Sequence, residues 1–585
     1  MQLSIFGVLS ALAAQGLASS LECKCTPNES CWPSVTEWNS LNKTVSGRLI
    51  RTVPAGSVCY PSQSNYDAQA CDAVRGNWTT WPFHSGNSVS TGNPDWDDAC
   101  TPIYPNGTSL TGNVDAGKEG CSIGNYSPYV VNATEVNHVQ AAVEFAKKWN
   151  LRLNIKNTGH SGWRSIAYGS LSIWTHHMKS FEYHDEFIAE SCPSQEATMA
   201  ATVGAGIQDG ELFANMAKHD AIAVGGENAD VGVVGWATGG GHGLATGVYG
   251  MGADNIIEAT VVTLDGKALK ANSCQNQDLF WAIRGGGGGT FGVITSLTVK
   301  AYEMPSVTLA SINVAANDSV STESWYSLVA QMHTQFPKLQ DEGLHGYYTM
   351  SGSPKSFVVT LLQYNEPNTT STKRLLEPLL ELLNAANSSA THSLAMKWVP
   401  SWYTLLKNVP MSGSTGSSHS VTASRLIPRR SLENADLLAQ VLETVASPNN
   451  VPDGVSNPSI SGTMTSSRKS VDNALNPAWR ETAVHFIASQ SWDDTVSEVV
   501  ANRVTEDMTY KRGYALRQLA PDAGAYFNEA NFHEPNWQWS LFGSNYPRLQ
   551  SIKEKYDPNH ILWCPNCVGS ESWALQDNGT LCRAF

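Results

Sequence analysis

The sequence predicts an α+β protein with two domains, and three observations lead to this prediction. The chain has 585 residues, more than one ordinary domain organises around a single core. Between about residues 121 and 303, strand and helix patterns alternate and run into glycine-rich loops. From about residue 304 to 520 glycine becomes rarer, and long helical patterns are separated by mostly antiparallel strands. We therefore expect a second domain in this later block.

The first 20 residues have the features of a secretory signal peptide. The apolar run from Ile5 to Ala14 is too short to span a bilayer, and Gly16 and Ala18 suit a cleavage site that needs small residues. The segment has no Lys or Arg before the apolar run, which is unusual for such a signal. No later segment is apolar for long enough to cross a membrane. We therefore expect a secreted protein.

Cysteine content and glycosylation motifs agree with export. The 12 Cys are an even number, consistent with disulfides formed in an oxidising compartment, although their pairing cannot be read from sequence. Zinc or redox motifs at Cys23, Cys25 and Cys31 or at Cys564 and Cys567 are the alternative, which export disfavours. N-glycans require exposed Asn-x-Ser/Thr motifs. These motifs begin at Asn28, Asn42, Asn77, Asn106, Asn125, Asn132, Asn317, Asn368, Asn387 and Asn578.

The charge balance argues against nucleic acid as a partner. The net charge is −15 and the pI about 5.5, whereas phosphate binding needs clustered Lys and Arg. Charged residues make up only 15% of the chain, which fits an enzyme that takes an uncharged small molecule. We expect such an enzyme to be a monomer.

The first part of the mature chain is expected to be a cap and then a small α/β unit. Residues 21–120 are rich in Pro, Ser, Asn, Trp and Cys without a long periodic run, which predicts a cap tied by disulfides. A short strand at 129–131 precedes a helix with Thr134 as its N-cap and apolar residues at helical spacing. Residues 151–156 then alternate apolar and polar side chains, the pattern of a half-buried strand.

This strand leads into a sharp loop of small residues, Asn157-Thr158-Gly159-His160-Ser161. Its backbone N–H groups and hydroxyls can surround a diphosphate closely, because glycine has no side chain that would hold the ligand away. His160 lies at the tip of the loop. On this motif alone, an ordinary loop histidine is an equally good interpretation.

Glycine dominates residues 231–252, and its density costs conformational entropy on folding. A flat bound cofactor that requires close backbone approach would explain this cost, and a flexible glycine-rich linker is the alternative. The linker interpretation is weakened because Asp265-Gly266, a strong hairpin signal, joins predicted strands at 256–264 and 267–271. The glycines are Gly232, Gly235, Gly239, Gly240, Gly241, Gly243, Gly247, Gly250 and Gly252.

Three familiar motifs do not fit. The run from Gly204 to Gly210 has its last glycine one position late for a dinucleotide fingerprint. A Walker loop would need Lys where Gly289 precedes Thr290, so nucleotide hydrolysis is disfavoured. A nucleophile elbow would need glycine where Trp163 stands.

The later block contains the predicted elements of a second domain. Helical patterns and strand patterns alternate there, and the strands are expected to form a mostly antiparallel sheet. The predicted helices include 324–336, 373–386 and 431–446, and the predicted strands include 344–350, 356–364, 459–466 and 482–491.

Seven motifs occur along the chain in a fixed order. They are Asn157-Thr158-Gly159-His160, Ser172-Ile173-Trp174-Thr175-His176, Gly239-Gly240-Gly241-His242-Gly243, Gly252-Ala253-Asp254-Asn255, Asp278-Leu279-Phe280-Trp281-Ala282-Ile283-Arg284-Gly285-Gly286-Gly287, Tyr526-Phe527-Asn528 and Tyr556-Asp557-Pro558. With these motifs the chain resembles the FAD-linked oxidoreductases of the vanillyl-alcohol-oxidase superfamily. It is most similar to the secreted fungal berberine-bridge-enzyme-like members, such as isoamyl alcohol oxidase-like proteins. The resemblance covers nearly the whole mature chain.

The resemblance refines the expected fold. It implies a discontinuous PCMH-type FAD-binding domain with two subdomains, formed by residues 121–303 and a C-terminal return at 521–585. It also implies that residues 304–520 form the substrate domain, whose mostly antiparallel sheet roofs the flavin and is backed by helices.

The resemblance also implies how FAD is held. His160 would be bonded covalently to the C8 methyl group of the flavin. Many relatives have a second link through Cys, but Asn228 occupies that position here, so one covalent bond through histidine is expected. The other implied cofactor-binding residues are Asn157, Thr158, Gly159 and Ser161 at the diphosphate, Gly239, Gly240, Gly241 and Gly243 beside it, Ile256 and Ile257 near the adenine, and Asn528 at the pyrimidine end of the ring. A simple turn residue is the alternative for Asn528.

The implied reaction is oxidation of an alcohol or hydroxylated small molecule, with hydride transfer to FAD and O2 as the acceptor that yields H2O2. Oxidative cyclisation or dehydrogenation in a secondary-metabolite pathway is the alternative within enzymes. A non-catalytic extracellular protein that binds flavin or glycans is the alternative of another class.

Alcohol oxidation requires a base for the hydroxyl proton. Tyr526 is the candidate by resemblance, although its phenol would need a lowered pKa. His485 and Gln363, on predicted roof strands, are weaker candidates because such residues are usually structural. No metal site is expected, because His176, His177 and His242 have no Asp or Glu at ligand spacing.

Overall fold

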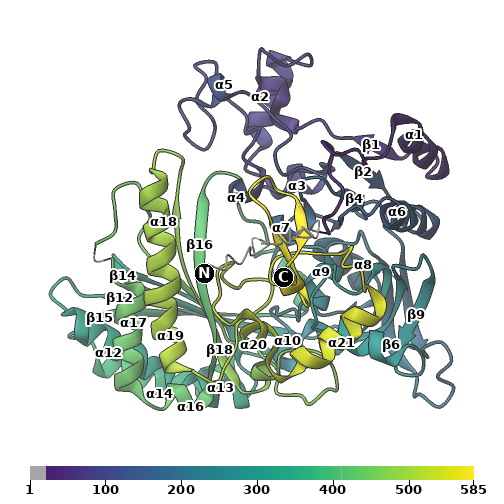
Figure 1. Cartoon of the computed structure of the whole chain (residues 1–585). Helices are drawn as coiled ribbons and strands as arrows, with labels where there is room; N and C mark the ends of the chain where they lie inside the picture. Colours follow the sequence, from purple (N-terminus) through teal and green to yellow (C-terminus); the bar gives the residue numbers. More distant parts are fainter. Residues whose placement is uncertain (1–21, 410, 449, 585) are drawn as a thin grey trace, which may run out of the picture.

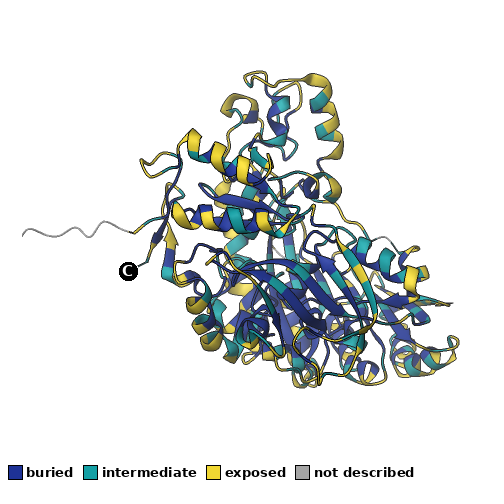
Figure 2. Ribbon diagram, turned by 90° about the vertical axis from the view of Figure 1, so that its right-hand side faces the viewer, coloured by how far each residue is buried: buried dark blue, intermediate teal, exposed yellow. Residues whose placement is uncertain are grey.

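The computed structural model describes residues 22–409, 411–448 and 450–584, and the predicted signal peptide lies outside them. The α+β prediction is confirmed, since helices pack against three sheets of four, five and seven strands (Figure 1). Among the described residues, no helix is both long and apolar enough to pass through a bilayer. Buried strands occupy the middle of the ribbon in Figure 2, and exposed helix faces lie at its margins. The predicted domain boundaries stay predictions.

The N-terminal cap, residues 22–120, contains short helices and one strand. Its strand β1 pairs antiparallel with β2, so the cap also supplies an edge strand to the first sheet. Trp38 of α1 stacks on Tyr129 with ring centroids 4.0 Å apart, which fixes the cap to the body. The elements are α1 (Val35–Thr44), β1 (Leu49–Arg51), η1 (Ala55–Cys59), α2 (Ala68–Asn77), α3 (Trp81–Ser85), α4 (Pro94–Asp97) and α5 (Ala116–Glu119).

The four-stranded sheet has the order β1-β2-β4-β3, with β2, β4 and β3 parallel. Helix α6 covers it, and its buried face includes Val139, Val143 and Ala146, the residues that predicted a helix. The helix begins one residue later than expected, with Glu135 as its N-cap in place of Thr134. The elements are β2 (Tyr129–Asn132), α6 (Val136–Lys148), β3 (Leu153–Lys156), α7 (Gly162–Ser165) and β4 (Leu171–Trp174).

The five-stranded sheet is antiparallel, in the order β5-β6-β10-β8-β9. The hairpin predicted at Asp265-Gly266 joins β8 to β9, and Gly266 has the positive φ of +83° that such a turn requires. The sheet packs with α8, α11 and the C-terminal segment around one hydrophobic core. The elements are β5 (Phe181–Phe187), β6 (Thr198–Gly204), α8 (Asp209–Met216), η2 (Ala217–His219), β7 (Ala221–Ile222), α9 (Val233–Thr238), α10 (Thr246–Tyr249), η3 (Gly252–Asn255), β8 (Ile256–Val262), β9 (Ala268–Asn272), α11 (Gln277–Ile283), β10 (Val293–Lys300) and β11 (Tyr302–Glu303).

The seven-stranded sheet is antiparallel throughout, in the order β15-β12-β14-β13-β17-β18-β16. One face packs on helices through a core that includes Trp325, Phe357 and Phe486 (Figure 1). Because side chains alternate along a strand, His485 lies on the opposite face from Phe486. The strands are β12 (Val307–Ala316), β13 (His345–Gly352), β14 (Lys355–Tyr364), β15 (Ala390–Val399), β16 (His419–Pro428), β17 (Ser459–Thr463) and β18 (Thr482–Trp492).

The helices of this block match the predicted ones in position, with one difference. The predicted helix 431–446 is interrupted, because the Asn434 side chain accepts a hydrogen bond from Leu437 N and starts a new helix. The helices are α12 (Thr322–His333), α13 (Phe336–Asp341), α14 (Thr370–Ala385), α15 (Trp402–Leu406), α16 (Arg429–Leu432), α17 (Ala435–Ala446), η4 (Pro477–Arg480), α18 (Glu498–Glu506), η5 (Asp507–Arg512) and α19 (Gly513–Leu519).

The C-terminal segment returns to the core of the five-stranded sheet. Phe527, Phe542 and Leu549 are buried in the same cluster as Leu212 and Leu297. Helix α21, yellow in Figure 1, packs against α11 and lies on the side of the view away from α17 and α18. The elements are α20 (Trp537–Phe542), η6 (Gly543–Asn545), α21 (Tyr546–Tyr556), η7 (Ser570–Ser572), β19 (Trp573–Leu575) and β20 (Leu581–Arg583).

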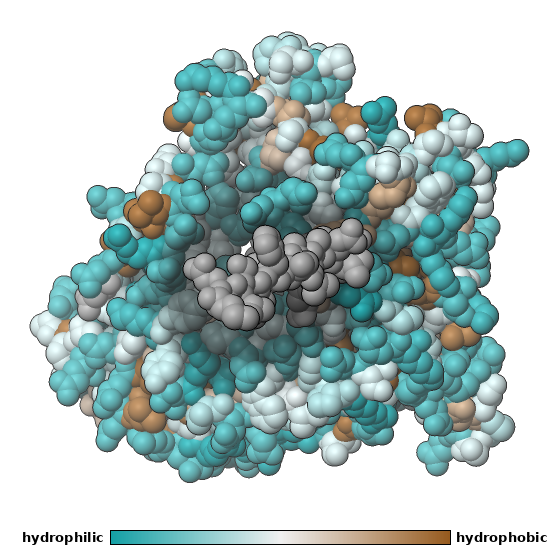
Figure 3. Space-filling model, in the orientation of Figure 1, coloured by the Kyte–Doolittle hydropathy of each residue, from teal (hydrophilic) through white to brown (hydrophobic). Residues whose placement is uncertain are grey.

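Six disulfides pair all 12 cysteines, so the prediction of structural bridges is confirmed. Cys23–Cys582 ties the start of the described chain to its end, and Cys564–Cys567 closes the C-x-x-C spacing. Of the ten glycosylation motifs, seven have an exposed Asn and three a half-buried one. The face drawn in Figure 3 is mostly hydrophilic, with scattered apolar residues.

His419 forms a charged bridge between the cap and the seven-stranded sheet. Its Nδ1 lies 2.7 Å from Asp95 Oδ1 and its Nε2 lies 2.7 Å from Asp494 Oδ1. Burial alone would lower the His419 pKa, but the hydrogen bonds to Asp494 and Asp95 outweigh it and raise the pKa to about 10. Burial raises the Asp494 pKa less than hydrogen bonds from His419 and Thr111 lower it.

The substitution His419→Gln is expected to destabilise the protein by about 1–3 kcal/mol at pH 5.5. Because the folded pKa of His419 exceeds the unfolded value of about 6.5, its contribution is full below that value and is lost as pH rises through about 10. The Asp494 contribution acts in the other direction and is lost below about pH 4. Urea unfolding at pH 5.5 and 9.5 measures this, and an equal loss at both pH values would contradict it.

Candidate active site

The candidate active site is a cavity of about 310 Å³ between the four-stranded sheet, the loop after β3, helix α9 and the C-terminal segment. This volume lies in the range of roughly 300–1,000 Å³ typical of small-molecule sites. The predicted site residues in its wall are Asn157, Thr158, Gly159, His160, Ser161, Tyr526 and Asn528. The structure therefore brings the loop and the C-terminal motif together across more than 360 residues of sequence, since Arg164 and Asn528 are 364 positions apart.

His160 presents a neutral imidazole to the cavity. Its ring stacks on Trp81 of the cap, with centroids 3.7 Å apart. Its Nε2 lies 3.6 Å from Asp230 Oδ2, and neither atom has a hydrogen-bond partner within the described chain. Burial lowers the His160 pKa more than Asp230 raises it. An unprotonated ring nitrogen is the form that a covalent bond to a cofactor requires.

The loop that carries His160 is held from both sides. Asn157 donates to Ala205 O at 3.1 Å, and its Oδ1 lies 3.2 Å from His176 Nδ1. Gly159 has φ +96°, and a side chain there would meet Thr91 and Ser90 of the cap at 3.1–3.2 Å. The tight turn thus depends on glycine, and Asn157 fixes the loop to the five-stranded sheet.

Arg164 joins this loop to the C-terminal segment and was not among the predicted site residues. Its Nε donates to Ser161 Oγ and its Nη2 to Asn528 Oδ1, both at 2.8 Å. Burial lowers its pKa to about 10, so it remains a cation at neutral pH and can bind an anionic group in the cavity. In the sequence, only its position one turn after the His160 loop indicated that Arg164 could belong to the site.

The glycines between residues 231 and 252 divide into two groups by their position relative to the cavity. Gly232 and Gly235 line the cavity, but Gly239, Gly240, Gly241 and Gly243 do not. Other protein atoms pack closely against these four glycines and leave no room for a side chain. An added Cβ would lie 1.7–2.9 Å from Asn528 at Gly239, from Leu475 at Gly240, from Trp236 at Gly241 and from Gly225 O at Gly243. Direct contact of these four glycines with a cofactor stays a prediction.

Other glycines and residues line the cavity instead. They come from the glycine-rich loop at residues 285–292 and from the C-terminal segment, and none of them was among the predicted site residues. They include Gly288, Gly289, Gly292, Glu529, Trp563 and Cys564. Ile256 and Ile257 are buried in β8 and do not appear in the wall, so their place near an adenine stays a prediction.

Tyr526 is fully buried at one end of the cavity, but its environment does not suit a base. Its hydroxyl accepts hydrogen bonds from Asn528 Nδ2 at 2.5 Å and Gly241 N at 3.3 Å. Burial, followed by the negative charge of Glu529, raises its pKa well above the ordinary value of 10. This shift is the reverse of the one a phenolate base needs, so Tyr526 is present as a neutral phenol.

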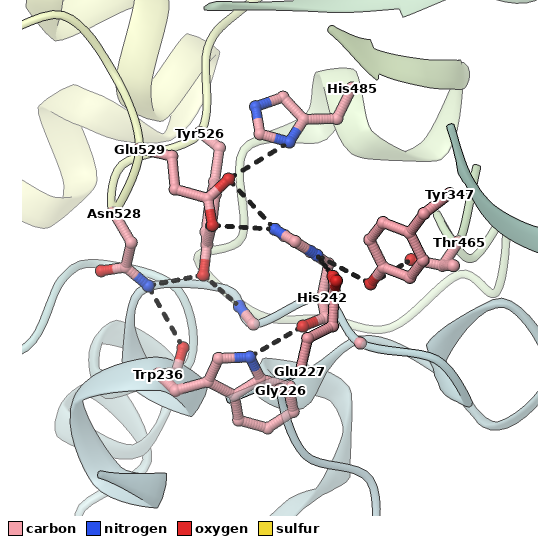
Figure 4. Close-up of polar contacts among 12 residues, drawn as sticks. Gly226, Glu227, Trp236, His242, Tyr347, Thr465, His485, Tyr526, Asn528 and Glu529 are labelled. Atoms are coloured by element: carbon pink, nitrogen blue, oxygen red, sulfur yellow. Dashed lines mark hydrogen bonds and ion pairs between the residues drawn. The ribbon is translucent and has the colours of Figure 1, made fainter. Parts of the chain in front are cut away.

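Beside Tyr526, His242 lies between two carboxylates (Figure 4). Its Nε2 is 3.1 Å from Glu529 Oε1, and its Nδ1 is 3.6 Å from Glu227 Oε1 and 3.1 Å from the Tyr347 hydroxyl. His485 Nδ1 lies 3.7 Å from Glu529 Oε2. The cluster joins the loops after β7 and α9, strands β13 and β18, and the C-terminal segment, so both domains contribute to it.

This grouping could not be found by spacing, because Glu529 is 287 positions from His242. The three histidines considered for a metal do not gather: His176 contacts Asn157, His177 contacts Asn132, and His242 lies in the cluster of Figure 4. His242, His485 and Glu529 do place three possible ligand atoms within 4.8 Å of one another. Gln363 lies elsewhere and bonds Thr372 at 2.7 Å.

The cavity fits FAD by three observations. The neutral His160 has an unpartnered buried nitrogen at the wall, within the described chain. A side chain added at Gly235 would meet no atom within 4 Å, so the glycine leaves open space in the cavity wall. The cation Arg164 is available for an anionic part of the cofactor. Asn157, Thr158, Gly159, Ser161 and Asn528 would complete the binding surface.

Comparison with known proteins agrees with this geometry. Residues 127–272 match the family model of an FAD binding domain, and residues 525–569 match the model described as berberine and berberine like. An uncharacterized FAD-linked oxidoreductase from Arthroderma benhamiae is 34% identical over 96% of both chains. The VAO-type flavoprotein oxidase VAO615 from Thermothelomyces thermophilus is 33% identical, covering 97% of this chain and 96% of the relative.

Solved structures give the same result. The crystal structure of the VAO-type flavoprotein MtVAO615 from Myceliophthora thermophila C1 has a TM-score of 0.86 and 31% identity, covering 96% of this chain and 100% of that chain. A carbohydrate oxidase from Microdochium nivale shares the fold, with a TM-score of 0.61 and 20% identity over 77% of this chain and 93% of that one. The predicted fold is therefore confirmed.

Proposed function

Because this chain belongs to the VAO-type, berberine-bridge-enzyme-like family of FAD-linked oxidoreductases, we propose that it is a secreted oxidase of alcohols or other hydroxylated small molecules. Bound FAD would supply the hydride acceptor and would be reoxidised by O2, giving H2O2. The relative VAO615 is named an oxidase, which supports O2 as acceptor over another oxidant. The glycosylation motifs, whose Asn residues are exposed or half-buried, and the six disulfides support export and N-glycans. The proposal includes a monomeric enzyme.

The observation that carries the proposal is the pairing, in one cavity, of an unprotonated His160 with a carboxylate at Glu529. His160 would hold the cofactor covalently, because its ring is fixed by Trp81 and faces the cavity. Asn528 and Arg164, bonded to each other, would orient the polar edge of the flavin ring. Glu529, Tyr526 and His242 lie at the end where the seven-stranded sheet closes over the site, so the substrate hydroxyl is expected there.

Three measurements test this function. The purified protein should be yellow, and the colour should stay in the precipitate after acid treatment, since a covalent flavin cannot be released. Peroxide should form with at least one of 1-butanol, vanillyl alcohol or cellobiose. Protein reduced with dithionite should be reoxidised by air within seconds. Slow reoxidation would point to a dehydrogenase or cyclase with another acceptor, and a colourless protein would leave only a binding function.

A further inference from the structure

A line of titratable side chains leads from the cavity wall to an exposed carboxylate. Glu529 lines the cavity, and its side chain is 37% exposed because it faces that space. His242, only 9% exposed, contacts Glu529 through Nε2 and Glu227 through Nδ1. The Glu227 side chain is 42% exposed. One imidazole therefore connects a carboxylate inside the cavity with a carboxylate that water can reach.

The two nitrogens of His242 suit it to pass a proton. An imidazole can accept a proton on one nitrogen while it releases one from the other. Burial lowers the His242 pKa less than the two carboxylates raise it, with Glu529 the stronger partner. Although part of the Glu227 side chain is exposed, the protein around the carboxylate still desolvates it and raises its pKa to about 7, so Glu227 can take up and release a proton near neutral pH.

His485 gives independent evidence that a polar group binds at this point. Its side chain is fully buried on β18, and within the described residues neither ring nitrogen has a hydrogen-bond partner. Burial lowers its pKa to about 3, so the ring is neutral. A buried neutral imidazole without a partner is costly, unless a hydroxyl bonds to it. Glu529, 3.7 Å away, would meet the same hydroxyl.

We propose that Glu529 is the catalytic base, and that His242 and Glu227 carry the proton it receives out of the cavity. This inference rests on the proposed oxidase function. The O–H bond of the substrate breaks and its proton moves to Glu529, while the C–H bond breaks and its hydride, with both electrons, goes to FAD. A C=O double bond forms. His242 then takes the proton on Nε2 and releases its Nδ1 proton to the Tyr347 hydroxyl, 3.1 Å away, which passes its own proton to Glu227 for exchange with water.

Tyr526 has a different role in this scheme. Its neutral hydroxyl, with two donors already bonded to it, can donate its own proton to the substrate oxygen but cannot accept one readily. Tyr347, whose pKa burial raises well above 10, bonds His242 Nδ1 and holds the ring in place. His485 would accept or donate a hydrogen bond to the substrate hydroxyl. These are the other titratable groups that face the cluster.

Two variants distinguish Glu529 from Tyr526 as the catalytic base. Anaerobic flavin reduction by whichever of vanillyl alcohol, 1-butanol or cellobiose reduces the wild type should slow roughly 10²–10⁴-fold in Glu529→Gln, the usual worth of a base. Tyr526→Phe should slow it less than about tenfold. Glu554→Gln is the matched control, since Glu554 contacts His560 at 2.9 Å away from the cavity wall, and it should behave as wild type. A larger effect in Tyr526→Phe than in Glu529→Gln overturns the proposal.

The proton path has its own readout. The wild-type rate should rise with pH through about 7, because the path must end on an ionised Glu227, and Glu227→Gln should lose this step. In Glu227→Gln the proton has no exit, so anaerobic reduction by the same substrate should produce a carboxylic-acid C=O band in the infrared difference spectrum. This band should be absent when Glu529→Gln is added. If no alcohol reduces the wild type, the proposed function fails, whereas the lack of the infrared band in substrate-reduced Glu227→Gln overturns the relay itself.

Discussion

The variant His160→Ala is expected to lose all covalent flavin. Alanine has no nucleophilic atom, so the C–N bond that would hold the cofactor cannot form. Trp81, stacked on His160 at 3.7 Å, would keep the wall of the cavity in place, and FAD could still bind reversibly through Arg164 and the Asn157 loop. After acid precipitation, the yellow colour should move entirely from the pellet to the supernatant.

His177→Ala is the matched control for this experiment. His177 follows the neighbouring strand β4, is exposed and contacts Asn132 rather than the cavity. Its substitution should leave the flavin in the pellet and the protein as stable as wild type. A coloured pellet from His160→Ala would mean that another residue carries the link, and the assignment of His160 would then be wrong.

Local pattern was sufficient to predict the elements that contain a clear apolar repeat or a strong turn signal. The alternating apolar residues at 151–156 gave β3, the helical spacing from Val136 gave α6, and Asp265-Gly266 gave the β8–β9 hairpin. In each case a side chain's burial follows from its position in a short repeat. Strands β12, β15 and β16 were not among the strands named. Strand β16 contains the buried cation Arg425, which donates to the carbonyl oxygens of Ala520 and Pro521, and no local pattern shows such tertiary contacts.

The site was predictable only where the motif itself lies at the cavity. The loop from Asn157 to Ser161 does, because a strand end and a positive-φ glycine place it there. The packing of Asn528 against Gly239 could not be predicted, because the two residues lie far apart in the sequence and only the fold brings them together. Glu529 and Glu227 gave no signal for the same reason: their chemistry arises from His242, which the fold inserts between them.

The Tyr556-Asp557-Pro558 motif contains Asp557, whose buried ion pair is expected to contribute strongly to the stability of the fold. Lys553 and Asp557, one turn apart at the end of α21, are 1% and 0% exposed, and their side chains meet at 2.6 Å. Lys553 also donates to Thr290 O and Leu562 O at 2.8 and 2.7 Å, while Asp557 accepts from Ile561 N and Leu562 N. This pair therefore joins the tail to the glycine loop that lines the cavity.

Lys553→Met is expected to destabilise the protein by roughly 3–5 kcal/mol, because it leaves the Asp557 carboxylate buried without its counter-ion. Lys555→Met, two residues further along, removes an exposed pair with Asp278 and should cost at most about 1 kcal/mol. Adding Asp557→Asn to Lys553→Met should restore part of the loss, since the amide is uncharged but its oxygen still accepts hydrogen bonds. The shift of the urea midpoint, followed by tryptophan fluorescence, measures all three. Equal shifts for Lys553→Met and Lys555→Met would show that burial does not make the Lys553–Asp557 pair more stabilising than an exposed pair. If Asp557→Asn restores no stability, the lost hydrogen bonds to Thr290 and Leu562 outweigh the unpaired charge of Asp557.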